Sequence, residues 1–252
     1  MELEDYGVFI KLVEEEYVED TLNGNLHFSS LKSFTELEEK QAGGIADKNE
    51  GTMNISIPMA NAFIRLTGDN KENKIMPLHN INARINFFLT EEQKKSTGIC
   101  CFMYLPISKF DCKKEGNIGI ASFGSKLREQ ILSFLNNTED EKEKKCEILM
   151  VDSTDLIELL KNNKLAYGTV YYYDNFNPDK TIDFVNTKNF SPVFCKSNIF
   201  SNQSEFRVVT KLPQGKEGVN LSIGRLNSGV ILDRNRLKDY AIGFRYVVDN
   251  TD

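Results

Sequence analysis

One apolar run constrains the fold of this chain more than any other part of it. Residues 99–105 read Ile-Cys-Cys-Phe-Met-Tyr-Leu and contain no charged side chain. Successive side chains of a strand point to opposite faces of a sheet, so a strand with one wet face shows polar residues at every second position. The uninterrupted run therefore predicts a strand buried on both faces, inside a sheet that is covered on each side.

The rest of the chain predicts many strands and few helices. Strand patterns fall at residues 6–13, 25–29, 53–57, 62–66, 82–89, 118–123, 147–151, 165–173, 182–185, 206–210, 219–223, 230–232 and 241–248. Short helices are expected at 14–22, 31–37, 126–135, 154–160 (capped by Ser153 or Thr154) and 234–239. Without regular βαβ alternation, this order predicts an α+β fold with mixed, mainly antiparallel sheets. We expect one domain over residues 1–252, with a charged surface loop at 137–145.

Composition excludes several classes of protein. The chain has 31 basic and 37 acidic residues and a net charge of −6. Such a chain is a poor non-specific binder of nucleic acid, because phosphate neutralisation needs clustered Lys and Arg. The N-terminus is acidic rather than basic and then apolar, and no apolar run approaches the ~20 residues of a membrane span. We therefore expect a cytoplasmic protein that does not enter a membrane.

Cysteine and histidine usage gives no metal pattern. The five cysteines include no C-x-x-C pair, and the two histidines, His27 and His79, have no zinc-site spacing. We predict reduced thiols and no metal. A P-loop, a G-x-G-x-x-G turn and a G-x-S-x-G elbow are all missing from the sequence. Candidate chemistry therefore rests on two other segments.

The first segment is the acidic, Gly-rich stretch 36–51, which we expect to form a loop. Its Asp47 and Glu50 stand three residues apart, after Gly43-Gly44. Carboxylates at this spacing suit a ligand-binding or metal-binding loop. The structural alternative is a solvated loop in which both carboxylates bond backbone amides.

The second segment is Gln203-Ser204-Glu205-Phe206-Arg207. In an extended chain Gln203, Glu205 and Arg207 share one face. Glu205 then suits a general base, or a group that stabilises a developing cation, with Gln203 and Arg207 orienting the substrate. The structural alternative is a Glu–Arg salt bridge on a strand face.

Both segments belong to blocks that resemble a broad group of bacterial and phage proteins. The first block runs from Asn23-Gly24-Asn25-Leu26-His27-Phe28 to Asp47-x-x-Glu50-Gly51, and the second from Val193-Phe194-Cys195-Lys196 to Gln203-x-Glu205-Phe206-Arg207. Abundant Asn, Lys and Ile suit the same origin. The blocks cover residues 6–51 and 193–209.

The Gln203-x-Glu205 triplet is also similar to the Gln/Glu-x-Glu motif of ADP-ribosyltransferases. The resemblance implies that Glu205 grips the nicotinamide ribose of NAD and stabilises an oxocarbenium-like transition state, while Gln203 orients the acceptor. It places Lys11 where those enzymes carry a basic residue on their first strand. His27, which stands in the first block, is a further ligand-binding candidate, beside its interpretation as a structural histidine. The Ser-Thr-Ser strand of the arginine-specific enzymes has no clear counterpart here.

Two functions remain open at this stage, with a third behind them. One is an ADP-ribosyltransferase-like or other NAD- or nucleotide-using protein, with Glu205 as its key acid. The other is a non-enzymatic binding or inhibitor protein in phage–host conflict, which binds a protein or a nucleotide. A metal-dependent nuclease built from Asp47, Glu50 and Glu205 lacks motif support. The first function predicts that these three acids line one pocket.

Overall fold

A computed structural model describes residues 6–40, 51–67, 73–142, 144–174 and 191–245, with the backbone alone for 37–40, 55–67, 73–85, 139–142 and 245. Its α-helices are α1 (Val18–Leu22), α2 (Leu31–Lys40), α3 (Glu91–Ser96), α4 (Ser125–Lys142) and α5 (Ser153–Asn162). Its 3-10 helices are η1 (Glu15–Tyr17), η2 (Ile107–Lys109), η3 (Pro192–Phe194), η4 (Asn198–Gln203) and η5 (Arg234–Asp239).

Most of the remaining structure is strand, and the main sheet has eight strands. These are β1 (Gly7–Glu14), β2 (Asn25–Ser30), β5 (Thr97–Pro106), β8 (Cys146–Asp152), β9 (Ala166–Thr169), β12 (Glu205–Lys211), β13 (Gly218–Ser222) and β14 (Val230–Leu232). All pairings in this sheet are antiparallel. The predicted α+β fold with mainly antiparallel sheets is confirmed.

The apolar run 99–105 is the central strand β5, as its composition predicts. The sheet has a core on each face. One core contains Phe9, Phe102 and Phe206 and is covered by α5, while the other contains Ile10 and Met103 and is covered by α4. Most side chains of β5 are buried, which suits its unbroken apolar run.

Three strands pair with β5, which has only two edges, so two of them share one edge and the sheet divides into two branches there. β12 takes one edge along its length, from Lys211 opposite Thr97 to Glu205 opposite Met103. β1 and β2 share the other edge: β1 pairs with 103–106 of β5, and β2 pairs with 98–99. The three residues 100–102 of β5 lie between them, at the place we call the fork. β1 pairs with β8, and β8 with β14, while β2 pairs with β13. Two branches of the sheet therefore leave β5 at the fork.

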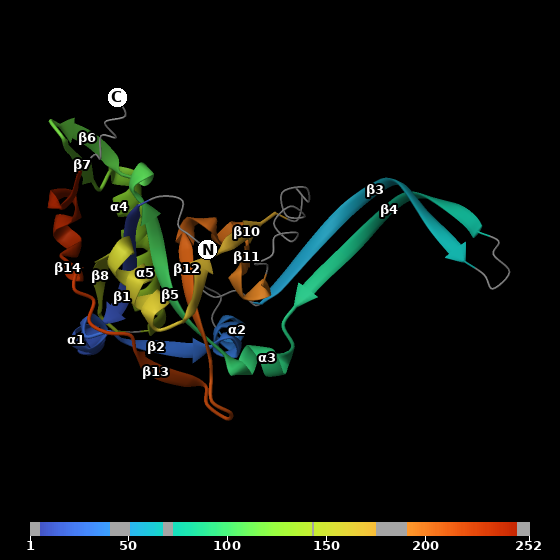
Figure 1. The fold of residues 1–252 in the computed structure, drawn as a ribbon, viewed down its shortest axis with the longest axis horizontal. Helices are drawn as coiled ribbons and strands as arrows, with labels where there is room; N and C mark the ends of the chain where they lie inside the picture. Colours follow the sequence, from blue (N-terminus) through green and yellow to red (C-terminus); the bar gives the residue numbers. More distant parts are fainter. Residues whose placement is uncertain (1–5, 41–50, 68–72, 143, 175–190, 246–252) are drawn as a thin grey trace.

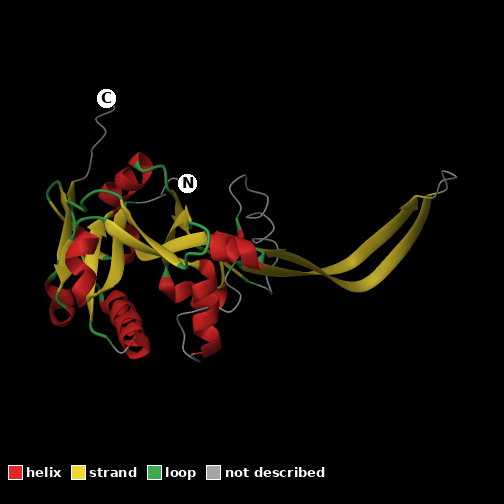
Figure 2. Ribbon diagram, turned by 90° about the horizontal axis from the view of Figure 1, so that it is seen from below, coloured by secondary structure: helices red, strands yellow, loops and turns green. Residues whose placement is uncertain are grey.

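Three smaller sheets surround the main one. β10 (Tyr171–Tyr173) pairs in parallel with β11 (Cys195–Ser197). β7 (Ile118–Ser122) lies between β6 (Asp111–Glu115) and β15 (Ala241–Arg245). The third is a two-stranded ribbon of β3 (Thr52–Thr67) and β4 (Asn73–Phe88), which we call the arm. It extends away from the rest of the described chain (Figures 1 and 2).

The structure corrects three local predictions. The charged stretch 137–145, expected as a surface loop, continues α4 as far as Lys142, because Thr138 is buried one turn beyond Phe134 and Leu135 and extends their inward face. α2 likewise runs on to Lys40, past the expected start of the loop at residue 36. The N-cap of α5 is Asp152, whose carboxylate accepts hydrogen bonds from the amides of residues 154 and 155.

The aromatic contacts of β12 give a direct test of this core. Phe206 is fully buried, and its ring centroid lies 4.5 Å from that of Phe9. Phe206→Ala should lower the free energy of unfolding by about 3–5 kcal/mol, because the cavity it leaves cannot collapse fully. Urea unfolding followed by circular dichroism measures this change. The control is Ile199→Ala, whose side chain is 76% exposed, and it should change stability by less than about 0.5 kcal/mol. Equal effects of the two substitutions would contradict the assignment of β12 to the core.

Candidate functional site

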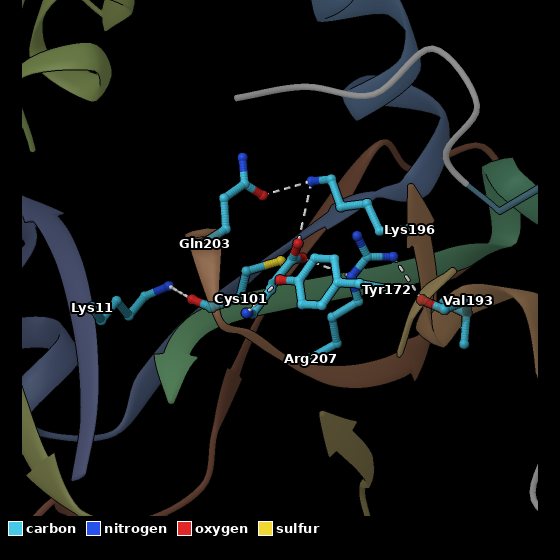
Figure 3. Close-up of polar contacts among 8 residues, drawn as sticks. Lys11, Cys101, Tyr172, Val193, Lys196, Gln203 and Arg207 are labelled. Carbon is cyan, nitrogen blue, oxygen red and sulfur yellow. Dashed lines mark hydrogen bonds and ion pairs between the residues drawn. The ribbon is translucent and has the colours of Figure 1, made fainter. Parts of the chain in front are cut away.

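A buried group of charged and polar side chains lies at the start of β12, and we call it the Glu205 cluster (Figure 3). Glu205 is 8% exposed and Arg207 is fully buried. Arg207 Nε donates to Glu205 Oε1 over 2.6 Å, and its Nη1 donates to the carbonyl oxygen of Val193 over 2.6 Å. Lys196 Nζ donates to Glu205 Oε2 over 3.2 Å and to Gln203 Oε1 over 2.9 Å. Each oxygen of the Glu205 carboxylate therefore faces a different cation.

The backbone around Glu205 is held on both sides. Its amide donates to the hydroxyl oxygen of Tyr172 over 2.7 Å, and its carbonyl accepts from the amide of Val170 over 2.8 Å. The preceding residue, Ser204, has left-handed backbone angles (φ 47°, ψ 43°), which a residue with a Cβ adopts at a cost. Lys109 Nζ donates to its hydroxyl oxygen over 2.7 Å. These contacts aim the Glu205 side chain into the cluster.

The left-handed turn changes one prediction about this segment. Glu205 and Arg207 share a face of β12, as the period of two requires. Gln203 ends the 3-10 helix η4, so strand alternation does not extend back to it. Its side chain still joins the cluster, through the hydrogen bond from Lys196. The Glu–Arg salt bridge that spacing allowed is present, and it lies within one strand rather than between two.

Electrostatics keep Glu205 ionised. Burial raises the pKa of its carboxyl, but the Arg207 guanidinium, and after it the Lys196 ammonium, outweigh burial and hold that pKa well below its usual range. The Cys101 thiol also bonds this carboxylate, and burial, followed by the charge of Glu205, raises the pKa of that thiol. Arg207 and Lys196 thus both face this one carboxylate. Glu205 is therefore a carboxylate, and not a proton donor, at neutral pH.

Two adjoining cavities approach the cluster from the fork. The larger, of about 640 Å³, lies between β1 and β2 and is lined from both strands, including Lys11 and His27. The smaller, of about 140 Å³, reaches Lys196, Gln203 and Glu205. The residues that line both cavities are Lys11, Leu12, Phe34 and Cys101. The two cavities therefore adjoin at the fork, and the smaller one reaches the Glu205 carboxylate.

Lys11 lies where the two cavities meet. Its Nζ donates to the carbonyl oxygen of Cys101 over 3.1 Å and lies 3.4 Å from Cys100 Sγ. It also lies 4.9 Å from the centre of the Phe102 ring. These contacts occupy the stretch of β5 that neither β1 nor β2 pairs, so Lys11 satisfies backbone that the fork leaves open. Both acceptors are uncharged, so neither of them cancels its positive charge.

His27 lines the larger cavity only. It stands on β2, is exposed, and its Nδ1 lies 2.6 Å from Asn220 Oδ1 on β13. Since an amide oxygen only accepts, Nδ1 carries the proton in this arrangement. The contact joins β2 to β13, which agrees with the structural interpretation of this histidine. Its ring also forms part of the cavity wall.

Apart from His27, the predicted site residues divide into three groups. Glu205, Gln203 and Lys11 meet at the small cavity, while Arg207 lies beneath it and supports Glu205. Asp47 and Glu50 fall outside the described residues, so the prediction that they share a pocket with Glu205 stays a prediction.

Sequence reasoning gave no role to four residues that complete the site: Lys196, Tyr172, Cys101 and Phe34. Of these four residues, Lys196 is the one to which the sequence could have pointed, because it stands within the second family-like block. The others come from segments whose approach to Glu205 depends on strand pairing.

Comparisons of this chain with protein-family models, with curated proteins and with solved structures found no match. Within the described ranges, no group of three or more His, Cys, Asp and Glu side chains is arranged to hold a metal ion. None of the helices in the described part of the chain is long and apolar enough to cross a membrane. The site is therefore argued from its own geometry.

The ion pairs of Glu205 predict a specific dependence of stability on pH. Glu205→Gln should lower the free energy of unfolding at pH 7 by about 3–5 kcal/mol, because Arg207 and Lys196 remain buried without their anion. The folded pKa of Glu205 is depressed, so its stabilisation is fully present above the unfolded value of about 4.3 and is lost as pH falls toward the folded pKa. Wild type should therefore lose more stability between pH 5 and pH 2 than Glu205→Gln does.

Urea unfolding at a series of pH values measures both curves. Glu115→Gln, at an exposed position on β6, is the matched control and should follow wild type within about 0.5 kcal/mol. Parallel curves for wild type and Glu205→Gln over this range would show that Glu205 is not an ionised partner in the folded protein.

Proposed function

We propose that this protein binds a nucleotide in the fork of its sheet and presents it to Glu205, in the manner of an ADP-ribosyltransferase-like, NAD-using protein. The observation that carries the proposal is the path of two adjoining cavities that ends at an ionised, buried carboxylate. The larger cavity, of about 640 Å³, falls within the usual range of about 300–1,000 Å³ for ligand sites. The smaller one has room for one ring or one sugar.

The side chains suit the parts of a dinucleotide. Lys11 supplies a positive charge at the junction of the cavities, where it would meet a phosphate. Phe34, from α2, adds an aromatic surface to both cavities. Glu205 and Gln203 supply acceptors and donors for ribose hydroxyl groups at the smaller cavity. NAD is therefore the first ligand to test.

The chemistry that fits an ionised carboxylate is stabilisation of positive charge. Cleavage of the bond between nicotinamide and ribose develops such a charge on the sugar, and a fixed carboxylate beside the anomeric carbon lowers its energy. Arg207 and Lys196 keep Glu205 ionised, although they also offset part of its field. In this proposal Gln203 holds the substrate and Arg207 holds Glu205.

A second candidate is a binding protein without catalysis. It is favoured by the same contacts: each oxygen of the Glu205 carboxylate already faces a cation, so the carboxylate serves as an internal counter-ion. The cavities would then hold a nucleotide, or part of a protein partner, without chemical change. If the occupant is NAD, the two candidates differ in whether nicotinamide is released.

Binding and turnover are measured separately. Titration calorimetry with NAD should show saturable binding to wild type, and Lys11→Met should weaken it about tenfold, which corresponds to about 1.4 kcal/mol. Lys113→Met, at an exposed position on β6, is the control and should bind as wild type does. If NAD, ADP-ribose and ATP all fail to bind wild type, the proposed function is wrong.

Nicotinamide release, followed by chromatography, tests the catalytic proposal. Wild type should release it, and Glu205→Gln should do so about 10²–10³-fold more slowly, by analogy with the removal of one stabilising group from other enzymes. Glu205→Asp keeps the charge and serves as a second variant if the glutamine variant does not fold. Binding by wild type without release of nicotinamide would instead support the non-catalytic candidate.

A further inference from the structure

The small sheet β10–β11 has two faces with different neighbours. Tyr172 and Lys196 are opposite each other in its parallel register, and both contact Glu205. The neighbouring positions Tyr171, Tyr173 and Cys195 point the other way, as the period of two requires. They pack against the base of the arm, so β10–β11 lies between the arm and the Glu205 cluster.

The base of the arm is a defined contact. Met53 of β3 is fully buried and forms a cluster with Tyr173 and Cys195, against which Phe87 of β4 packs. The hydroxyl of Tyr173 donates to the carbonyl oxygen of Thr52 over 3.3 Å. β3 also contacts η3, the segment whose Val193 carbonyl accepts the hydrogen bond from Arg207.

The segments that hold Glu205 therefore pack against the same strand. Lys196 and Tyr172 come from β10–β11, and the carbonyl that holds Arg207 comes from η3. Both segments rest on β3 at the base of the arm. Beyond this base the arm extends away from the rest of the described chain (Figure 1). Only the two-stranded sheet β10–β11 lies between the base of the arm and the Glu205 carboxylate, so a change in packing at the base can alter the position of that carboxylate.

We propose that Lys196 and Tyr172 are positioning residues for Glu205, and that the base of the arm holds both in place through β10–β11. This inference rests on the proposed function for its catalytic meaning, but its structural content can be tested without a nucleotide. Loss of the contacts at Met53 and Phe87 should loosen the Glu205 cluster although neither residue touches it.

The reporter is the chemical reactivity of Lys196 itself. Its ammonium is 3% exposed and is held by Glu205 and Gln203, so it should react slowly with an amine-acylating ester. Peptide mass spectrometry gives its acylation rate. Met53→Ala combined with Phe87→Ala should raise that rate about tenfold, because local opening of the cluster becomes more frequent.

The control separates local loosening from general instability. Leu160→Ala, in α5 on the far face of the main sheet, removes a fully buried side chain that belongs to another core. Measured at equal distance below each variant's Tm, it should change the Lys196 rate by less than about twofold. If the double variant does not fold, Tyr173→Phe removes only the hydroxyl bonded to Thr52 and should raise the rate about twofold to threefold. An unchanged Lys196 rate, or an equal rise in Leu160→Ala, would overturn the inference.

The catalytic part has its own readout. Lys196→Met removes a cation beside Glu205, so the pKa of that carboxyl rises and the acid limb of the pH profile for nicotinamide release moves to higher pH. Lys196→Arg restores the charge and should return the limb toward wild type. Unmoved profiles in Lys196→Met would reject the positioning role of Lys196. Absence of NAD turnover in wild type would reject the catalytic candidate instead, and the acylation experiment would still stand.

Discussion

The sharing of one edge of β5 by β1 and β2 is the constraint on which the rest of this structure depends. Because β12 occupies the other edge from Thr97 to Met103, β1 and β2 share the remaining edge, and 100–102 of β5 pair with neither. Unpaired backbone inside a protein needs a partner, and Lys11 provides one for the carbonyl of Cys101. At the fork β5 lacks strand pairing on one edge, and the same gap between β1 and β2 contains the cavity that adjoins the Glu205 site.

The Glu205 cluster shows how a buried carboxylate is kept charged. Desolvation alone would neutralise it, and two cations, rather than one, reverse that tendency. The arrangement suits a site that needs a permanent negative charge at neutral pH. It also suits a purely structural ion network, because each carboxylate oxygen already has a partner. The adjoining cavity is what distinguishes this cluster from a network sealed in a core.

The cluster is assembled from elements that contribute little to it individually. β12 supplies Glu205 and Arg207, η4 supplies Gln203, and β10–β11 supplies Tyr172 and Lys196. β10–β11 has only three residues in each strand, and a sheet of that size is not stable without support. Packing on the base of the arm provides this support on one face, and the cluster provides it on the other. The site and the base of the arm are therefore linked through the two-stranded sheet β10–β11, which packs against both.

The sequence by itself determined the fold class, the central position of residues 99–105 and the shared face of Glu205 and Arg207. These follow from local rules: an unbroken apolar run needs two dry faces, and Glu205 and Arg207 two apart on a strand share one face. Only the tertiary structure decided that Lys11 lies near Glu205 and that Lys196 and Tyr172 hold it. These contacts join residues far apart in the chain, and strand register, which no single segment encodes, brings them together. The extension of α4 to Lys142 is also a feature of the folded structure, in which Thr138 is buried although the charged sequence around it is locally compatible with a loop.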